Sequence, residues 1–108
     1  MTVFVIQDDP HKSFRDAENF GKLEFLFGRD VFPGEQERVQ DMVDIAYSKL
    51  KCFNPRTDYV LLVGDPVGIA VSTAVLSEFH NEIPVLKWDK QQGQYFPLTI
   101  TLDNREEI

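Results

Sequence analysis

Two apolar runs of the sequence, 3–7 and 59–63, each end in a short group of polar and glycine residues. Where such runs form neighbouring parallel strands, their carboxyl ends meet at the crevice in which open α/β sheets bind ligands. The start of a helix there offers free N–H groups to an anion, and two carboxylates facing it could hold a divalent cation. The candidate ligand-binding residues are Asp8, Asp9, Gly64, Asp65 and Gly68.

Folding alone also explains the second of these groups. Asp65 is a favourable N-cap, and Pro66 stands at the first helical position, where its missing N–H costs nothing. Gly64 permits a sharp turn, and Gly68 lets a helix approach the sheet closely. The segment has no phosphate-loop or dinucleotide-binding glycine pattern, and Asp65 would place a negative charge where a phosphate would bind. We therefore favour the structural interpretation over a ligand site.

No group of residues has the spacing of a catalytic or metal site. Cys52 is the single cysteine, so neither an internal disulfide nor a cysteine-based zinc site is possible within one chain. His11 and His80 lie far apart in the sequence, and Ser72 lacks the glycines of a nucleophile elbow. We therefore predict a protein that is not an enzyme, with no catalytic residue, no metal and no cofactor.

Trp88 and Tyr95 flank the turn of an expected hairpin. Exposed aromatic side chains beside an edge strand can mark a surface that binds a partner. The same two residues can equally form a cross-strand aromatic pair that closes the hairpin. Both interpretations stay open, and Trp88 and Tyr95 are our candidate partner-binding residues.

The elements that position these residues follow from residue type and spacing. Val39, Met42, Val43, Ala46 and Leu50 form one helical stripe, which predicts the clearest helix of the chain. The expected strands are 3–7, 22–27, 59–64, 84–89 and 94–102, and the expected helices are 35–51 and 66–79.

The order of these elements predicts the fold. Strands joined by helices pair in parallel, and the short turn 90–93 makes the last two strands an antiparallel hairpin. Pro97 cannot donate to a central ladder, which puts its strand at an edge. We expect one compact α/β domain over 1–102, followed by a polar tail, 103–108. Its five-stranded sheet is expected to be mixed but mainly parallel, with two main helices, in a flavodoxin-like or Rossmann-like arrangement.

The composition of the chain excludes some classes of binding partner. The 108 residues carry a formal net charge of −7, which disfavours binding to nucleic acid. No apolar run approaches the ~20 residues that a membrane helix needs. The N-terminus has no pattern of a secretory signal. We therefore expect a cytoplasmic protein that binds neither nucleic acid nor membranes.

Two longer segments, 58–75 and 85–102, resemble a group of small proteins encoded by tailed bacteriophages. The first contains D-Y-x-L-x-x-G-D-P and the second L-K-W-D-x-Q-x-x-x-Y-x-P. The matching residues are Asp58, Tyr59, Leu61, Gly64, Asp65, Pro66, Leu86, Lys87, Trp88, Asp89, Gln91, Tyr95 and Pro97. The segments 4–7 and 16–26 are also similar, so the resemblance covers most of the chain. The group has no established activity, and the resemblance implies a small accessory protein that binds something of the host.

Two functions follow as hypotheses. The first is a non-enzymatic phage accessory protein that binds a protein partner of the host in the host cytoplasm. A homodimer is part of this hypothesis, because the helix 66–79 is apolar nearly all round and a second subunit could help to bury it. The alternative is a protein that sequesters a small ligand or nucleotide in the crevice described above.

Overall fold

The computed structural model describes residues 1–29 and 36–102 of the chain. Five strands form one sheet in the order β2-β1-β3-β4-β5. The strands are β1 (Thr2–Gln7), β2 (Lys22–Phe27), β3 (Tyr59–Leu61), β4 (Glu82–Asp89) and β5 (Gln94–Thr101). The helices are α1 (Gln36–Leu50), α2 (Pro66–Phe79) and a short 3₁₀ helix, η1 (Arg15–Phe20). The predicted single α/β domain is confirmed, whereas the predicted tail 103–108 and the helix start at residue 35 lie outside the described residues.

The pairing of the strands confirms a mixed sheet. β1 pairs in parallel with β2 and β3, and β3 pairs in parallel with β4. β4 and β5 form the predicted antiparallel hairpin. Describing the sheet as mainly parallel was too strong, because this antiparallel ladder runs the full length of both strands whereas β3 is short. The strand order is that of flavodoxin-like sheets with the last strand reversed.

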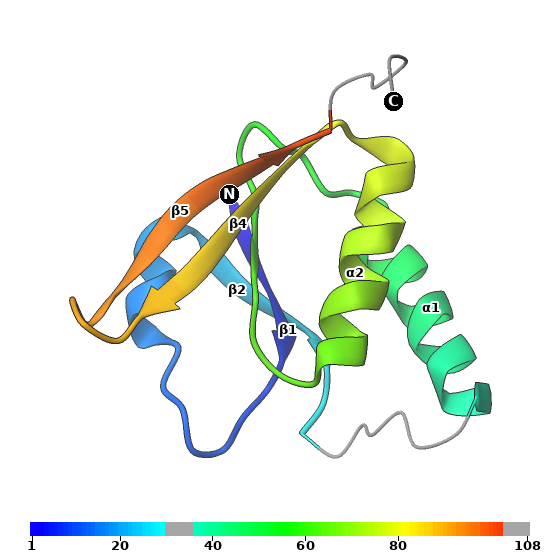
Figure 1. Cartoon of the computed structure of the whole chain (residues 1–108), viewed down its shortest axis with the longest axis horizontal. Helices are drawn as coiled ribbons and strands as arrows, with labels where there is room; N and C mark the ends of the chain where they lie inside the picture. Colours follow the sequence, from blue (N-terminus) through cyan, green and yellow to red (C-terminus); the bar gives the residue numbers. More distant parts are fainter. Residues whose placement is uncertain (30–35, 103–108) are drawn as a thin grey trace.

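The two faces of the sheet are covered differently. Both long helices pack on one face, and η1 lies on the other (Figure 1). On the helix side, Phe4, Ile6 and Val60 of the sheet are buried against α1 and α2. On the other side, Val3 and Val5 belong to a smaller core that includes residues of η1 and its approach. α2 packs on β1 and β4, so β5 lies beyond the helical layer (Figure 1).

The two long helices agree closely with the sequence. Met42, Ala46 and Leu50 of the predicted α1 stripe are buried, and Val39 and Val43 are partly buried against the same core. This confirms the helical stripe. α2 begins at Pro66 and ends at Phe79 as predicted, because the Asp65 side chain caps its first turn. No helix in the described part of the chain is long and apolar enough to cross a membrane.

Two local predictions were wrong. β3 ends at Leu61 rather than at residue 64. In the strand 22–27, the alternation of Leu23, Phe25 and Phe27 in the sequence predicts that they share one face. Instead, Phe27 turns into the helix-side core while Leu23 packs on the opposite side. Heavy burial of α2 is expected from its apolar residues, either by the sheet alone or by the sheet and a second subunit. The sheet alone does not achieve it, because Val67 and Ala70 are exposed, and burial by a second subunit stays a prediction.

Candidate functional site

The crevice predicted between β1 and β3 is filled by the side chain of Gln7. Its Oε1 accepts a hydrogen bond from the Asp65 N–H at 2.7 Å, and its Nε2 donates to the Gly28 carbonyl at 3.2 Å. Gly64 crosses directly over it with φ +105°, and a Cβ added there would lie 2.6 Å from Gln7 Oε1. The protein's own amide therefore occupies the place where this sheet topology would hold a ligand.

The carboxylates predicted for this crevice also have partners within the protein. Asp8 Oδ2 accepts a hydrogen bond from Arg29 Nε at 2.9 Å in an ion pair, and Asp9 Oδ1 accepts one from the His11 N–H at 2.8 Å. Asp65 Oδ1 accepts one from the Val67 N–H at 2.8 Å and so caps α2. All three carboxylates thus stabilise the conformation of a loop or of the start of a helix.

The two glycines of the predicted site have structural roles as well. Gly64 takes the left-handed conformation that its turn requires. Gly68 allows α2 to pack closely, because a Cβ there would meet Met42 of α1 at 3.3 Å and Phe27 of β2 at 3.4 Å. The structure therefore gathers Gln7, Gly64 and Asp65 at one point and places Gly68 in the packing between helix and sheet.

The aromatic residues of the hairpin form a direct cross-strand pair. Trp88 lies opposite Tyr95 in the β4–β5 register, and their ring centroids are 4.8 Å apart at an interplanar angle of 67°. This confirms the predicted pair. The Trp88 side chain is still 42% exposed. Burial, together with the negative charge of Asp16, raises the pKa of the Tyr95 phenol above its ordinary value, so this ring stays neutral at physiological pH.

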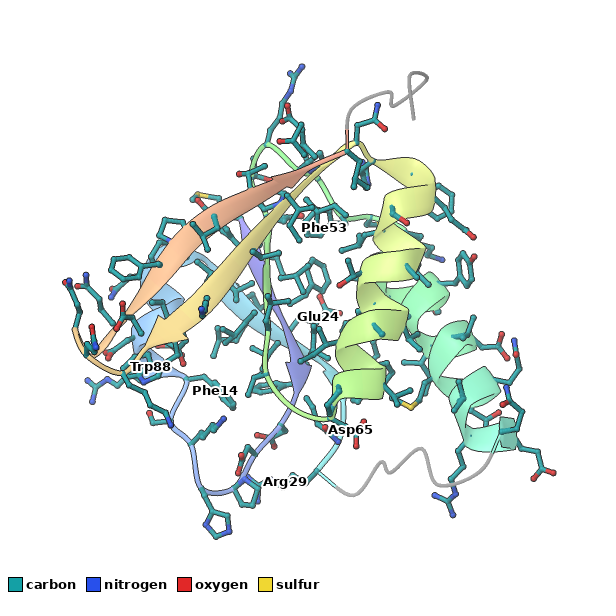
Figure 2. The ribbon with its side chains drawn as sticks, viewed as in Figure 1. Phe14, Glu24, Arg29, Phe53, Asp65 and Trp88 are labelled. Carbon is teal, nitrogen blue, oxygen red and sulfur yellow. The ribbon has the colours of Figure 1, made fainter. Side chains whose placement is uncertain are left out.

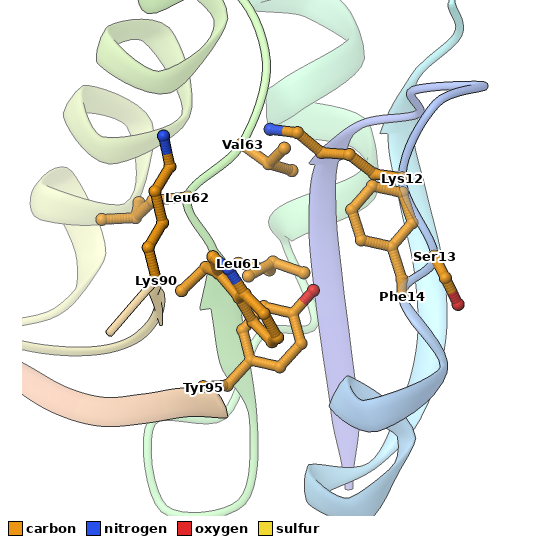
Figure 3. A pocket seen from close by; sticks show the side chains of 9 residues that line it. Lys12, Ser13, Phe14, Leu61, Leu62, Val63, Lys90 and Tyr95 are labelled. Atoms are coloured by element: carbon orange, nitrogen blue, oxygen red, sulfur yellow. The ribbon is translucent and has the colours of Figure 1, made fainter. Parts of the chain in front are cut away.

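A pocket of about 310 Å³ lies beside this pair. It opens where the segment before η1, the end of β3 and the hairpin meet, away from Asp65 at the start of α2 (Figure 2). We call it the hairpin pocket, and its lining residues are Lys12, Ser13, Phe14, Leu61, Leu62, Val63, Trp88, Lys90 and Tyr95 (Figure 3). The lining is mostly apolar, with two lysines.

The other side of the hairpin carries an exposed apolar row. Leu98 and Ile100 pair with Val85 and Ile83, which face the helical core, and the row is continued by Phe96, opposite Lys87, and by Leu102. Because α2 does not extend over β5, Leu98 is 54%, Ile100 37% and Leu102 41% exposed. We call these four residues the β5 stripe. No residue from 94 to 102 carries a charge.

The outer edge of β5 also presents free main-chain groups. The Leu102 N–H donates to the Asn81 carbonyl at 2.7 Å, so the even-numbered residues of the strand bond inward to β4. The N–H groups of Thr99 and Thr101 then point outward, where no described strand pairs with them. Pro97 shares this outward register, so its missing N–H costs the ladder nothing.

Several residues of these sites were not predicted. Lys12, Phe14 and Lys90 come from separate segments, and no spacing in the sequence links them. Asp58 is buried and accepts hydrogen bonds from the N–H groups of Thr2 and Asn54, both at 2.9 Å. Its position just before an apolar run was the one available signal for this structural role.

The fold and these surfaces define a small single-domain α/β protein with a closed crevice and an open aromatic hairpin. Over residues 1–102 the chain matches the sequence model of the Phage Pam3 gp32-like protein family. The chain belongs to this family and is therefore a bacteriophage protein, in line with the resemblance to phage proteins noted above. No curated protein and no solved structure matches the chain.

Proposed function

We propose that this protein is a non-enzymatic phage accessory protein that binds a protein partner of the host along β5. The observation that carries the proposal is the combination, on one strand, of an edge with which no described strand pairs and an exposed apolar row. Natural edge strands are usually protected by charges, and β5 has none, with Pro97 as its one protecting residue. The proposed place of action is the cytoplasm of the infected cell.

The binding mode follows from the register of the edge. The outward N–H and carbonyl groups of Thr99 and Thr101 can pair with an added strand, which supplies affinity through the main chain. The β5 stripe, next to that strand, supplies apolar contacts and hence selectivity. Because the strand is uncharged, the net charge of −7 does not place a repelling group on this edge.

The hypothesis of a non-enzymatic protein draws support from the crevice. Gln7, Asp8, Asp9 and Asp65 each bind groups of the protein itself, so their polarity has a structural explanation. The strand order also supports a proposed kinship with flavodoxin-like or Rossmann-like folds. In this protein Gln7 fills the crevice in which such folds bind ligands, and the hairpin is the region that remains exposed for binding.

The test compares complexes captured from infected cells with two variants at one position. Thr99→Pro removes the outward N–H without removing a bond to β4, whereas Thr99→Val keeps that N–H and tests the loss of the hydroxyl alone. We expect one set of partners to be recovered with the original chain and with Thr99→Val, and to be lost with Thr99→Pro. Equal recovery with all three proteins would contradict binding at this edge.

A second copy of the chain is the other possible occupant of β5, and sedimentation separates it from a host partner. If the original chain sediments as a dimer and Thr99→Pro as a monomer, the edge binds its own copy. If both sediment as monomers and the captured partner is lost only with Thr99→Pro, the occupant is the host protein that we propose.

The alternative function, a protein that sequesters a small ligand or nucleotide in the crevice, has less support because Gln7 fills that space. It predicts that nucleotides or divalent ions raise the melting temperature, by an amount that corresponds to about 2.7 kcal/mol at 100 times the dissociation constant. Stabilisation that survives a change in the hairpin pocket but not Gln7→Ala would favour this alternative.

A further inference from the structure

The hairpin pocket has the construction of a small-molecule site rather than of a gap between loops. Leu61, Val63 and Phe14 form its apolar wall and are all buried. Tyr95, which is edge-on to Trp88, closes one side (Figure 3). The volume of about 310 Å³ falls at the lower end of the range for ligand pockets, which suits a molecule with one ring system.

Two positively charged side chains, Lys12 and Lys90, line this apolar pocket. Lys12 comes from the segment before η1 and Lys90 from the hairpin turn, and both side chains extend along its walls (Figure 3). Within the described part of the chain, no carboxylate lies within salt-bridge distance of either ammonium group. In a chain with a net charge of −7, two lysines at one pocket that have no carboxylate partner among the described residues create a local site for negative charge.

Two acidic residues, Asp16 and Asp89, also lie next to residues of the pocket. Asp89, beside Lys90, accepts hydrogen bonds from the N–H groups of Gln91 and Gln92, and this holds its carboxylate in the hairpin turn. Asp16 acts electrostatically on the Tyr95 phenol. An anion in the pocket would be attracted by the two ammonium groups and kept away from the Tyr95 side by the charge of Asp16, while its apolar part would contact aromatic and aliphatic side chains.

We propose that the hairpin pocket binds a small organic anion with a planar aromatic body. The ring would lie against Phe14, Leu61 and Tyr95, and the anionic group would lie between Lys12 and Lys90. An aromatic carboxylate and a nucleoside monophosphate share this chemistry. No residue of the β5 stripe lines the hairpin pocket, although Trp88 and Lys90 also line a neighbouring hollow together with Phe96 and Leu98 of the stripe.

The test uses three probes with nearly the same ring and different charge: phenylacetate, phenylacetamide and phenethylamine. Trp88 is the single tryptophan of the chain and lines the pocket, so its fluorescence reports binding there directly. We expect phenylacetate to bind about five- to tenfold more tightly than the neutral amide, and the amine to bind most weakly. Added salt should reduce the difference, because it screens exposed charges.

Variants test whether the two lysines cause the preference for the anionic probe. Lys12→Gln with Lys90→Gln should remove the preference for phenylacetate over the amide, whereas Lys22→Gln, an exposed lysine on β2 outside the pocket, should leave it unchanged. These side chains are exposed, so the variants should fold normally. Equal affinity for the three probes, or no saturable change in Trp88 fluorescence with any of them, would overturn the proposal.

The natural ligand could be an aromatic carboxylate or a nucleoside monophosphate. Competition of adenosine monophosphate with phenylacetate distinguishes the two, and adenosine shows the effect of removing the phosphate. If the nucleotide competes with phenylacetate and binds more tightly than it, the pocket is a nucleotide site. If phenylacetate is the tighter ligand, the pocket selects aromatic carboxylates. The stripe variant Leu98→Ser should bind all probes like the original chain, which separates this proposal from the proposed partner surface.

Discussion

The crevice at β1 and β3 and the hairpin of β4 and β5 contrast in how their side chains are used. At the crevice, polar side chains of types that often bind ligands form hydrogen bonds within the protein instead. Gln7 bridges two loops and Asp65 caps a helix. At the hairpin, apolar and aromatic side chains that look structural are left exposed. Residue type alone therefore does not determine which of the two regions stays open, because that depends on the packing around each of them.

The cause of the difference is the layer of helices. α1 and α2 cover β1, β3 and β4 on one face, and the turn leading into α2 closes the crevice from above. In place of a further helix, β4 is followed by a tight turn and β5, so no long helix of the described chain covers β5 on the helix side of the sheet. The exposed surface is a direct consequence of ending the fold on a hairpin.

The largest effect should come from Gly64 at the crevice, and Gly93 of the hairpin turn, which also has a positive φ, is the comparison. Gly64→Ala combines a strained backbone with overlap on Gln7, and we expect it to lower the free energy of unfolding by about 2–6 kcal/mol. Gly93→Ala, in the hairpin turn, has φ +63° and open space around it, so only about 1 kcal/mol is expected. Urea denaturation of both variants checks this, and equal losses would show that the crevice is not closely packed.

Gln7→Ala should have the next largest effect. It leaves the Asp65 N–H and the Gly28 carbonyl without their side-chain partner, which should cost about 2 kcal/mol. Gln92→Ala, an exposed glutamine of the hairpin turn, is the matched control, with an expected change within about 0.5 kcal/mol. If the two variants unfold at the same urea concentration, Gln7 does not hold the crevice closed.

Removing the helix cap should have a smaller effect. Asp65→Ala loses the hydrogen bond to the Val67 N–H and should cost about 1 kcal/mol, whereas Asp65→Asn keeps an acceptor and should be close to the original chain. Thermal unfolding checks both variants. A nucleotide site at this turn predicts a different result, because Asp65→Ala would then improve nucleotide binding by removing a negative charge.

The smallest effect on stability is expected at the β5 stripe. Leu98→Ser replaces a side chain that is 54% exposed, so the free energy of unfolding should change by less than about 0.5 kcal/mol. Its effect should instead be on the recovery of the partner from infected cells. A large loss of stability would show that Leu98 belongs to the core and that the hairpin is not an open surface.

Most of the fold could be predicted because its signals are local. Asp65 and Pro66 determine where α2 starts, the spacing of Met42, Ala46 and Leu50 determines the buried face of α1, and Pro97 indicates an edge strand. The direction of Phe27 could not be predicted, because it depends on how α1 and α2 pack over the end of β2. Local signals in the sequence therefore predict the helices, the strands and their order in the sheet, but not how side chains pack at the ends of the strands.

The sites were harder to predict because they depend on contacts between distant segments. Gln7 and Asp65 are 58 residues apart, and only their hydrogen bond shows that the crevice is filled. Trp88 and Tyr95 could be singled out because the hairpin places them opposite each other. The lysines that flank the pocket beside them could not, since Lys12 and Lys90 are brought together only by the completed sheet.

Amide hydrogen exchange of the dilute, purified chain tests the contrast between the two regions most directly. The Asp65 amide, bonded to Gln7 Oε1, should exchange slowly, and the outward amides of Thr99 and Thr101 should exchange rapidly. Binding of a partner or a second copy should then slow Thr99 and Thr101 while leaving Asp65 unchanged. Rapid exchange at Asp65, or protection of Thr99 and Thr101 at every protein concentration, would contradict a closed crevice and an open edge.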